Sequence, residues 1–365
     1  MSLFSILLFI IILLVLVFVH EFGHFFTAKL AKMRVDEFAL GFPPKIFSKT
    51  IGETKYSINI IPFGGFVSIF GENFADNEVG ERDKRAFNNR PYLHQLIVLL
   101  AGIFMNFLLA LVIFIFLFYG NVDASKSDPA FASRVIGGRV MIIDSSKGSP
   151  AFMAGLLPGA VIEQIKSGNE VAKLDSETDV ITFIQKNIDK PISISFTNIY
   201  NQKITTVISG VYGIVPDKKA LGISVDVIGK VKVGFFEAVK IGSVKTYDIT
   251  VETLAGLKSL IISVAHRQNV IDSLAGPIGI AKIVGATSMY GYQAVLNLVA
   301  VLSINLAILN LLPIPALDGG RAIVVLFESI FKKKVPYKIL SIVNTVSFLL
   351  LILLLVAVSI KDVYR

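Results

Sequence analysis

Long apolar runs separated by polar segments are the main feature of the chain. A run of about 20 apolar residues can cross the ~30 Å hydrocarbon core of a bilayer as an α-helix. Phe22, Phe25 and Phe26 extend the first run past three ionisable residues. The pattern therefore predicts four transmembrane helices, which contain the apolar runs at residues 3–19, 93–119, 292–312 and 339–360.

The first run is expected to be retained rather than cleaved. A signal peptide carries basic residues before its apolar region and a small-residue cleavage site after it. The run at residues 3–19 has neither feature. We therefore expect it to remain in the membrane as the first helix.

A different pattern lies between the second and third apolar runs. Short β-type runs alternate there with Gly, Asn, Asp and Pro, which are turn residues. This pattern predicts a soluble α+β domain over residues 135–230. The strands and helices that we expect in it lie at residues 139–143, 149–155, 178–186, 191–196 and 203–209.

Residues 235–264 place apolar side chains near helical spacing, but charged residues recur throughout the segment. Such a mixture favours an amphipathic helix on the membrane surface over a transmembrane helix. We expect this helix and a connector to occupy residues 235–290.

Composition and charge fit a membrane protein. The chain is 54% hydrophobic and 17% charged, and it carries a formal net charge of +8. Its basic residues gather beside the apolar runs, so the charge indicates membrane orientation and no nucleic-acid partner is expected. The loops that follow the first and third runs are the basic ones, so we expect them to face the cytoplasm. Both termini and the soluble domain would then face outward.

His20, Glu21 and His24 form an H-E-x-x-H motif at the end of the first apolar run. On a helix, residues i and i+4 share a face, so both imidazoles can hold one metal ion. Glu21 adjoins His20 and can act on a water at that ion as a general base. The alternative is a pair of interfacial histidines beside a solvated glutamate. Three ionisable residues within a membrane helix are costly, which favours the functional interpretation.

A catalytic zinc site has three protein ligands, and Asp318 is the best candidate for the third. The chain has no cysteine, and His94 and His266 show no ligand spacing. Two prolines and two glycines interrupt the apolar segment 310–320 and break its helix. Irregular backbone at membrane depth is tolerated only when it is buried in protein or lines a wet cavity. The alternative role of Asp318 is an N-cap of the next helix.

The two halves of this site are expected at the same membrane depth. The 17 residues 3–19 precede His20, and they correspond to ~26 Å of helix. This places the metal toward the cytoplasmic side. Asp318 follows the third run, which crosses from outside to inside and therefore ends on that side as well.

The chain resembles the bacterial site-2 protease family, and within it the RseP-type branch. The resemblance covers nearly the whole chain and is carried by HEFGH in the first run, Ala101-Gly102 with Asn106 in the second, and NLLPIPALDGG at residues 310–320. It implies that His20, His24 and Asp318 bind Zn²⁺ and that Glu21 activates water. It further implies that a set of polar residues handles substrate, namely Asn106, Asn305 and Asn310.

The same resemblance extends to a membrane-associated β-hairpin at residues 55–66. The residues expected to handle substrate there are Gly64, Gly65 and Phe66. An exposed strand edge can pair with an unwound substrate and hold its backbone extended. The alternative is a simple cytoplasmic hairpin that covers the site.

Residues 148–159 resemble the turn region of a bacterial PDZ domain. Such domains bind peptide ends through backbone donors and an apolar pocket, so a peptide ligand is a potential partner. The resemblance implies that the outward domain filters substrates by size. An inert spacer domain is the alternative.

The predicted fold class is a polytopic α-helical membrane protein with an inserted α+β PDZ-like domain and a membrane-associated β-hairpin. Residues 1–32 form the first transmembrane segment with HExxH, residues 33–92 the cytoplasmic loop with the hairpin, and residues 93–120 the second transmembrane segment. Residues 135–230 form the PDZ-like domain, and residues 235–290 the amphipathic helix and connector. Residues 291–330 form the third transmembrane segment with the LDG motif, and residues 337–361 the fourth.

The predicted function is that of a zinc metalloendopeptidase in the bacterial cytoplasmic membrane. By resemblance, its substrates are transmembrane segments of single-pass proteins already trimmed outside, such as anti-sigma factors or remnant signal peptides. This activity is regulated intramembrane proteolysis, with the lipid bilayer as the second partner. Two alternatives stay open, a non-catalytic metal-binding scaffold and a transporter.

Overall fold

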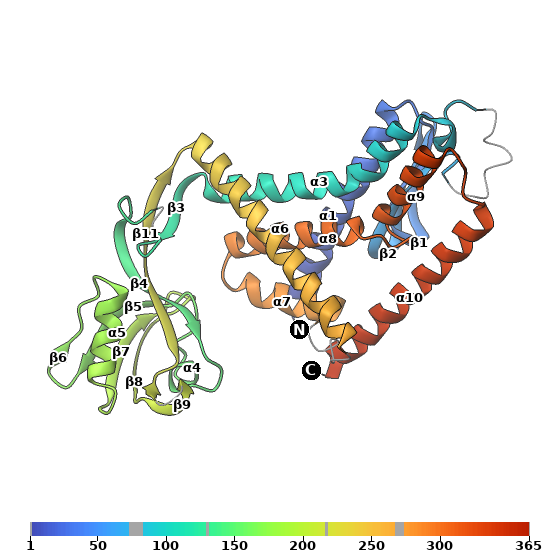
Figure 1. Ribbon diagram of the computed structural model, residues 1–365. Helices are drawn as coiled ribbons and strands as arrows, with labels where there is room; N and C mark the ends of the chain where they lie inside the picture. The colour runs from blue at the N-terminus through green and yellow to red at the C-terminus, as the bar shows by residue number, and fades with distance from the viewer. Residues whose placement is uncertain (1, 73–82, 129–130, 216–217, 267–273, 365) are drawn as a thin grey trace. The chain divides into compact units, whose positions relative to one another are not determined.

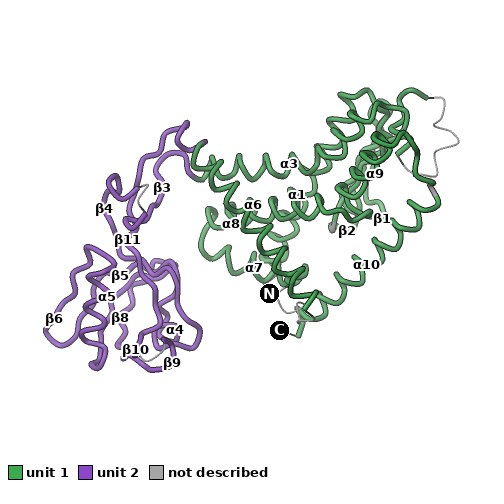
Figure 2. Tube along the Cα trace, in the orientation of Figure 1, with its two compact units in different colours: residues 1–117, 240–365 green, residues 118–239 purple. Residues whose placement is uncertain are grey.

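The computed structural model describes residues 2–364 except 73–82, 129–130, 216–217 and 267–273. The chain forms two compact units (Figure 2). Unit 1 contains residues 1–117 and 240–365, and unit 2 contains residues 118–239.

Unit 1 contains the helices that can cross a membrane (Figure 1). Among the described residues, four helices are long and apolar enough, so the prediction of four transmembrane helices is confirmed. They are α1 (Leu3–Leu30), α3 (Tyr92–Phe118), α8 (Tyr292–Leu311) and α10 (Tyr337–Tyr364). The hydroxyl of Ser2 caps α1 by accepting the Ser5 N–H at 3.1 Å, which satisfies a donor that the first turn leaves free.

Among the described residues, three other helices of the second half of the chain lack the length or the apolar composition of a transmembrane helix: α6 (Phe235–Ala265), α7 (Pro277–Ser288) and α9 (Asp318–Phe331). The sequence predicted an amphipathic helix over residues 235–264, and α6 is one continuous helix with nearly these bounds. Pro313 and Pro315 lie between α8 and α9. The helix is interrupted there because proline lacks the N–H donor that an α-helix requires.

A long β-hairpin packs against α1. Its strands are β1 (Val35–Ile51) and β2 (Thr54–Ile69), which pair antiparallel. Both strands bend, so residues 37–40 pair with 65–68 on one side and with 55–58 on the other. In this register residues 65–68 form an outer edge. The segment 55–66, expected to be a hairpin by itself, is therefore part of the second strand of a larger hairpin.

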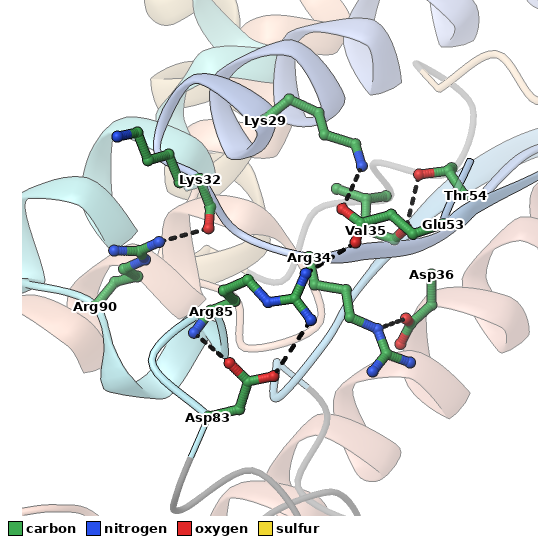
Figure 3. Close-up of polar contacts among 10 residues, drawn as sticks. All are labelled: Lys29, Lys32, Arg34, Val35, Asp36, Glu53, Thr54, Asp83, Arg85 and Arg90. Carbon is green, nitrogen blue, oxygen red and sulfur yellow. Dashed lines mark hydrogen bonds and ion pairs between the residues drawn. The ribbon is translucent and has the colours of Figure 1, made fainter. Parts of the chain in front are cut away.

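Polar contacts attach the β1–β2 turn of this hairpin to neighbouring segments (Figure 3). Glu53 in the β1–β2 turn accepts from Lys29 of α1 at 3.0 Å and from Arg85 at 2.9 Å. The Thr54 hydroxyl donates to the carbonyl of Val35 at 2.8 Å. The turn is thereby held next to the end of α1.

Unit 2 is a β-sheet domain with short helices. Its main sheet has the strand order β3-β11-β4-β5-β7-β8, with β6 paired to β5. Alternate residues of β7 are buried, and Ile192, Ile194 and Phe196 join a core that also contains Val180 of α5. The elements of this sheet and its helices are β3 (Gly120–Ser125), β4 (Ile136–Ser145), α4 (Pro150–Met153), β5 (Val161–Ser167), β6 (Glu170–Val171), α5 (Glu177–Lys186), β7 (Ile192–Thr197), β8 (Lys203–Ile208) and β11 (Ile223–Val233).

Unit 2 extends beyond the residues 135–230 expected for the soluble domain. Its first strand, β3, pairs antiparallel with the end of β11, from Gly120 opposite Val233 to Ser125 opposite Ile228. Only two residues of β3, Val122 and Ala124, are apolar and buried, and its Gly, Asn, Asp and Ser are typical of turns, so no strand was predicted here. A separate pair, β9 (Val211–Val215) with β10 (Lys218–Ala220), lies off the main sheet.

Candidate metal centre

His20 and His24 lie on one buried face of α1. Each residue is only 8% exposed. Their spacing of four residues brings the two Nε2 atoms to 3.2 Å from each other, as helical geometry requires of side chains at i and i+4.

Asp318 comes from the other end of the chain and meets both histidines. Its Oδ2 lies 3.0 Å from Nε2 of His20 and 3.2 Å from Nε2 of His24. Asp318 is the first residue of α9, whose N-cap is Leu317. The alternative of an N-cap role for Asp318 therefore does not hold, and its carboxylate is directed at the imidazoles instead.

Two glycines let α9 begin at this position. A Cβ at Gly319 would collide with the carbonyl of Leu311, and one at Gly320 would collide with the carbonyl of Ile314. The start of α9 can therefore pack directly on the backbone that ends α8. This packing fixes the position of Asp318, the first residue of α9, relative to the end of α8.

The three ligand atoms have the spacing of a zinc site. Ligands at 2.0–2.1 Å from a tetrahedral zinc ion lie about 3.3 Å from one another. The observed separations between His20, His24 and Asp318 are 3.2, 3.0 and 3.2 Å. In addition, the buried Oδ2 of Asp318 makes no regular hydrogen bond with any described residue. The residues present therefore fit a zinc ion, and they are the one potential metal-binding cluster found among the described residues.

Hydrogen bonds orient both imidazoles toward the centre. Nδ1 of His24 lies 2.8 Å from the carbonyl oxygen of Val98 on α3. That oxygen can only accept, so Nδ1 of His24 carries the proton and Nε2 presents its lone pair to a metal. The backbone of α3 thus selects the tautomer that binds metal.

Asn106 supports His20 in the same way. Its side-chain amide lies 3.2 Å from Nδ1 of His20 and is fully buried. An imidazole that binds metal through Nε2 carries its proton on Nδ1 and needs an acceptor there. The atom of Asn106 that faces Nδ1 of His20 is Nδ2, whereas Oδ1 is buried without a hydrogen-bond partner in the described structure. Rotating the amide by 180° exchanges Oδ1 and Nδ2 and supplies the acceptor that a metal-bound His20 requires. The family resemblance implied a role with substrate for Asn106, and the structure places its side chain against His20 of the centre.

Gly102 is required by the packing of α3 against both histidines. A Cβ at this residue would collide with Nε2 of His24 and would lie 2.7 Å from Cε1 of His20. On α1, Gly23 has a similar function, because a Cβ there would lie 2.6 Å from the carbonyl oxygen of Ala101. Sequence reasoning did not identify Gly102 as part of the site. The signal was its spacing of four residues from Asn106, which puts both on one face of α3.

Glu21 lies between the two histidines in sequence and faces the hairpin. A Cβ at Gly65 of β2 would lie 3.2 Å from Cγ of Glu21 and 2.9 Å from the carbonyl oxygen of Ala39. The outer edge of the hairpin therefore passes next to the carboxylate. Glycine at this position permits the close approach.

The remaining predicted residues lie around this edge or elsewhere. Gly64 has a φ of +124° and packs on the ring of Phe42. Phe66 pairs with Ala39 and is half-buried. Asn305 accepts a hydrogen bond from the Thr253 hydroxyl of α6 at 2.9 Å.

Asn310 is half-buried on α8. Neither Asn305 nor Asn310 belongs to the cluster of potential metal ligands, and His94 and His266 do not belong to it either.

An ion pair that the sequence did not indicate joins the hairpin to α9. Arg321 lies one turn after Asp318, and its Nη1 is 2.7 Å from Oε1 of Glu72, just beyond β2. The Glu72 side chain is only 9% exposed. This pair fixes the metal-binding turn of α9 relative to the strand that passes Glu21.

Comparison with known proteins identifies the family. The model of the family described as "Peptidase family M50" matches residues 8–354. The chain belongs to peptidase family M50. The family expected from the sequence, that of the site-2 proteases, is thereby confirmed, and the protein is a metalloprotease of the membrane.

Individual M50 relatives match the chain along its length. Two proteins, both named "Putative zinc metalloprotease", are 32% identical: one from Clostridium perfringens, with 95% of each chain covered, and one from Fusobacterium nucleatum, with 98% and 97% covered. The zinc metalloprotease RasP of Geobacillus kaustophilus is 28% identical, with 99% of this chain and 98% of RasP covered.

Proposed function

We propose that this M50 protein hydrolyses peptide bonds within membrane segments of other proteins, at a zinc centre formed by His20, His24 and Asp318. The observation that carries the proposal is the convergence of three ligand atoms, from α1 and α9, at the separations expected around one zinc ion. The relatives named as zinc metalloproteases support the choice of metal. When bound, zinc polarises a carbonyl and lowers the pKa of water.

Glu21 is the catalytic residue in this proposal. Its carboxylate adjoins the ligand His20 on α1 and accepts a proton from the attacking water. It then donates this proton to the nitrogen of the amine that leaves. The two histidines keep their orientation throughout, because Val98 and Asn106 hold the Nδ1 atoms.

The outer edge of the hairpin positions the substrate. Residues 65–68 pair with β1 on one side only, which leaves backbone donors and acceptors for an added strand. Gly65 packs against Glu21, so a strand added here passes the catalytic carboxylate in an extended form. A helical substrate must unwind first because its own hydrogen bonds occupy the scissile carbonyl. Gly64 and Phe66 belong to the same edge.

Unit 2 is proposed to be a PDZ-like domain that meets the substrate outside the membrane. Residues 223–227 of β11 pair with β4, whereas β3 pairs only with residues 228–233. The first half of β11 therefore has a free edge, and α5 packs against this strand. A strand edge beside a helix is the arrangement that supports peptide binding by strand addition.

The orientation and substrates follow from the same proposal. The basic loops after α1 and α8 face the cytoplasm, and both termini and unit 2 face outward. The membrane is the bacterial cytoplasmic membrane. The substrates are single-pass proteins already trimmed outside, such as anti-sigma factors or remnant signal peptides.

Substitution of the catalytic carboxylate tests the proposal. Purified Glu21→Gln protein should bind zinc with the stoichiometry of the wild type, because no ligand is removed. It should cleave a model transmembrane substrate at least about 100-fold more slowly, since general acid–base catalysis typically contributes 10²–10⁴-fold. The matched variant Glu163→Gln changes an exposed carboxylate of β5 in unit 2 and should cleave normally.

Three other results of these measurements would each contradict a different part of the proposal. Normal cleavage by Glu21→Gln would show that the carboxylate is not the general base. Wild-type protein that binds zinc but cleaves no membrane substrate would indicate a metal-binding scaffold or transporter. Wild-type protein without zinc would refute the metal centre itself.

A further inference from the structure

One face of α9 is apolar and exposed. Its large side chains are 46–64% exposed and recur at helical spacing: Ile323, Leu326, Phe327, Ile330 and Phe331. The opposite face is anchored, because Ala322 and Val325 are buried in a core with residues of α1 and α3. The exposed stripe is therefore fixed in direction rather than free to rotate.

A lysine cluster follows directly at the end of this helix. Lys332, Lys333, Lys334 and Lys338 are all exposed. Lys332 has a left-handed backbone, with φ of +51°, and ends α9. The Val335 N–H donates to Oε1 of Glu328 at 2.9 Å, which closes the turn after the helix. The cluster is thus presented by an ordered turn.

The charges of these lysines are not neutralised by any acid that the structure describes. None of the four forms an ion pair with a described residue. Some cations elsewhere in unit 1 do form ion pairs: Lys29 and Arg85 share Glu53, and Arg34 pairs with Asp36 (Figure 3). This cluster, called the lysine turn below, can therefore bind an anionic partner outside the described chain.

The surroundings identify the chemistry of that partner. The turn connects α9 to α10, which is long and apolar enough to span the bilayer, and α8 precedes α9 as another such helix (Figure 1). The apolar stripe of α9 thus lies between two membrane helices in sequence and matches acyl chains. Four cations beside an apolar helix face complement the phosphate of a lipid headgroup.

We propose that the stripe of α9 and the lysine turn together form a docking surface for anionic phospholipids of the bilayer. The acyl chains pack on Phe327, Phe331 and their neighbours. The headgroup phosphates of several lipids contact the lysines. Because the same helix begins at Asp318, the lipids hold the far end of the element that supplies the third metal ligand.

Lipid selectivity of the reconstituted full-length protein tests this surface. The measurement is electron paramagnetic resonance of spin-labelled phosphatidylglycerol and phosphatidylcholine in vesicles, which compares the motionally restricted fractions. Wild-type protein should favour the anionic lipid by about fivefold at low salt, and added salt should reduce the preference. The triple variant Lys332→Gln, Lys333→Gln, Lys334→Gln should lose most of it.

A charge-matched control separates a specific surface from net charge. Lys147, Lys173 and Lys190 are exposed residues of unit 2, and their replacement by glutamine removes the same charge. This control should retain the wild-type preference. The proposal is overturned if wild type shows no preference, if the Lys332–Lys334 variant keeps it, or if the control loses it equally. Circular dichroism checks that all variants are folded, and no readout depends on proteolysis.

Discussion

At the scale of single residues, the metal centre depends on Gly102, which has no side chain. Gly102 of α3 faces both imidazoles, and any Cβ at this position would occupy the space of Nε2 of His24. The surrounding helices cannot separate easily, since Gly23 of α1 packs equally closely on the carbonyl of Ala101. The two glycines therefore set the distance between the ligand helix and the helix that orients it.

Gly102→Ala should accordingly disrupt the centre without unfolding the protein. The added methyl group must displace His24 or His20, so zinc affinity should fall by at least about 10–100-fold, the loss typical of altered support around a metal ligand. The measurement is zinc content after dialysis against a competing chelator. Gly256→Ala on α6 is the matched control, because a Cβ there meets nothing within 4 Å. Equal zinc retention by both variants would contradict the packing argument.

The residues of the centre differ in how far the sequence could predict them. His20, Glu21 and His24 follow one another within one helical turn, so local spacing was sufficient. Asp318 was predicted from a broken helix at the matching membrane depth, and the structure brings it to the histidines. The positions of Gly102 and Asn106 beside the histidines were not predicted. Their spacing of four residues places both on one face of α3, but the partner of that face depends on long-range packing, which local sequence does not specify.

At the scale of elements, the position of α9 is determined from two sides. Its buried face contributes Ala322 and Val325 to the core shared with α1 and α3. Its first turn is tied to the hairpin by the Arg321–Glu72 pair at 2.7 Å. The hairpin in turn passes Glu21 at Gly65. The catalytic carboxylate and the third ligand are thus positioned by one connected set of contacts.

The β1–β2 turn of the hairpin should become more mobile in acid. Glu53 accepts a hydrogen bond from Lys29 and lies beside Arg85, and both contacts lower the pKa of its carboxyl below the ordinary 4.5. A carboxyl whose pKa is lower in the folded state stabilises that state above its unfolded pKa. This contribution is lost as the pH falls from about 4.5 through the folded pKa. The effect should be small because the pair is half-exposed.

A spin label on Ser48, introduced through a single cysteine in this cysteine-free chain, would report this mobility. Its mobility should rise on acidification below about pH 4.5. In the variant Glu53→Gln the label should be mobile already at neutral pH and show less change in this range. A wild-type label with no pH response would contradict the role of Glu53.

The hairpin also shows the limit of prediction at this scale. The resemblance placed a hairpin at residues 55–66, but this segment lies entirely within the second strand of a hairpin that begins at Val35. β1 contributes an apolar stretch interrupted by Gly41, Pro43 and Pro44, which weakens the period-two pattern. Bent strands pair with two neighbours at once, and such pairing is not encoded in the local sequence.

At the scale of the whole molecule, the centre belongs to one unit although its ligands are far apart in the chain. His20 and Asp318 are separated by 298 positions (318 − 20), yet both lie in unit 1. Unit 2 is inserted between them at residues 118–239. Topology explains how this is possible: Gly120 and Val233 are paired on β3 and β11, so the insertion leaves and rejoins unit 1 at neighbouring points.

Removal of unit 2 should therefore leave zinc binding intact. Replacement of residues 120–233 by a short Gly/Ser linker needs to bridge only about 5 Å, the separation of paired residues on adjacent strands. Zinc binds the folded state, so chelation should lower the thermal midpoint of the full chain, and a ligand at 100 times its Kd contributes about 2.7 kcal/mol. The shortened protein should show a drop of similar size, whereas Asp318→Ala should show none in either background. A shortened protein that stays folded but does not respond to chelation would mean that unit 2 contributes to the centre, and the proposed independence of the two units would be wrong.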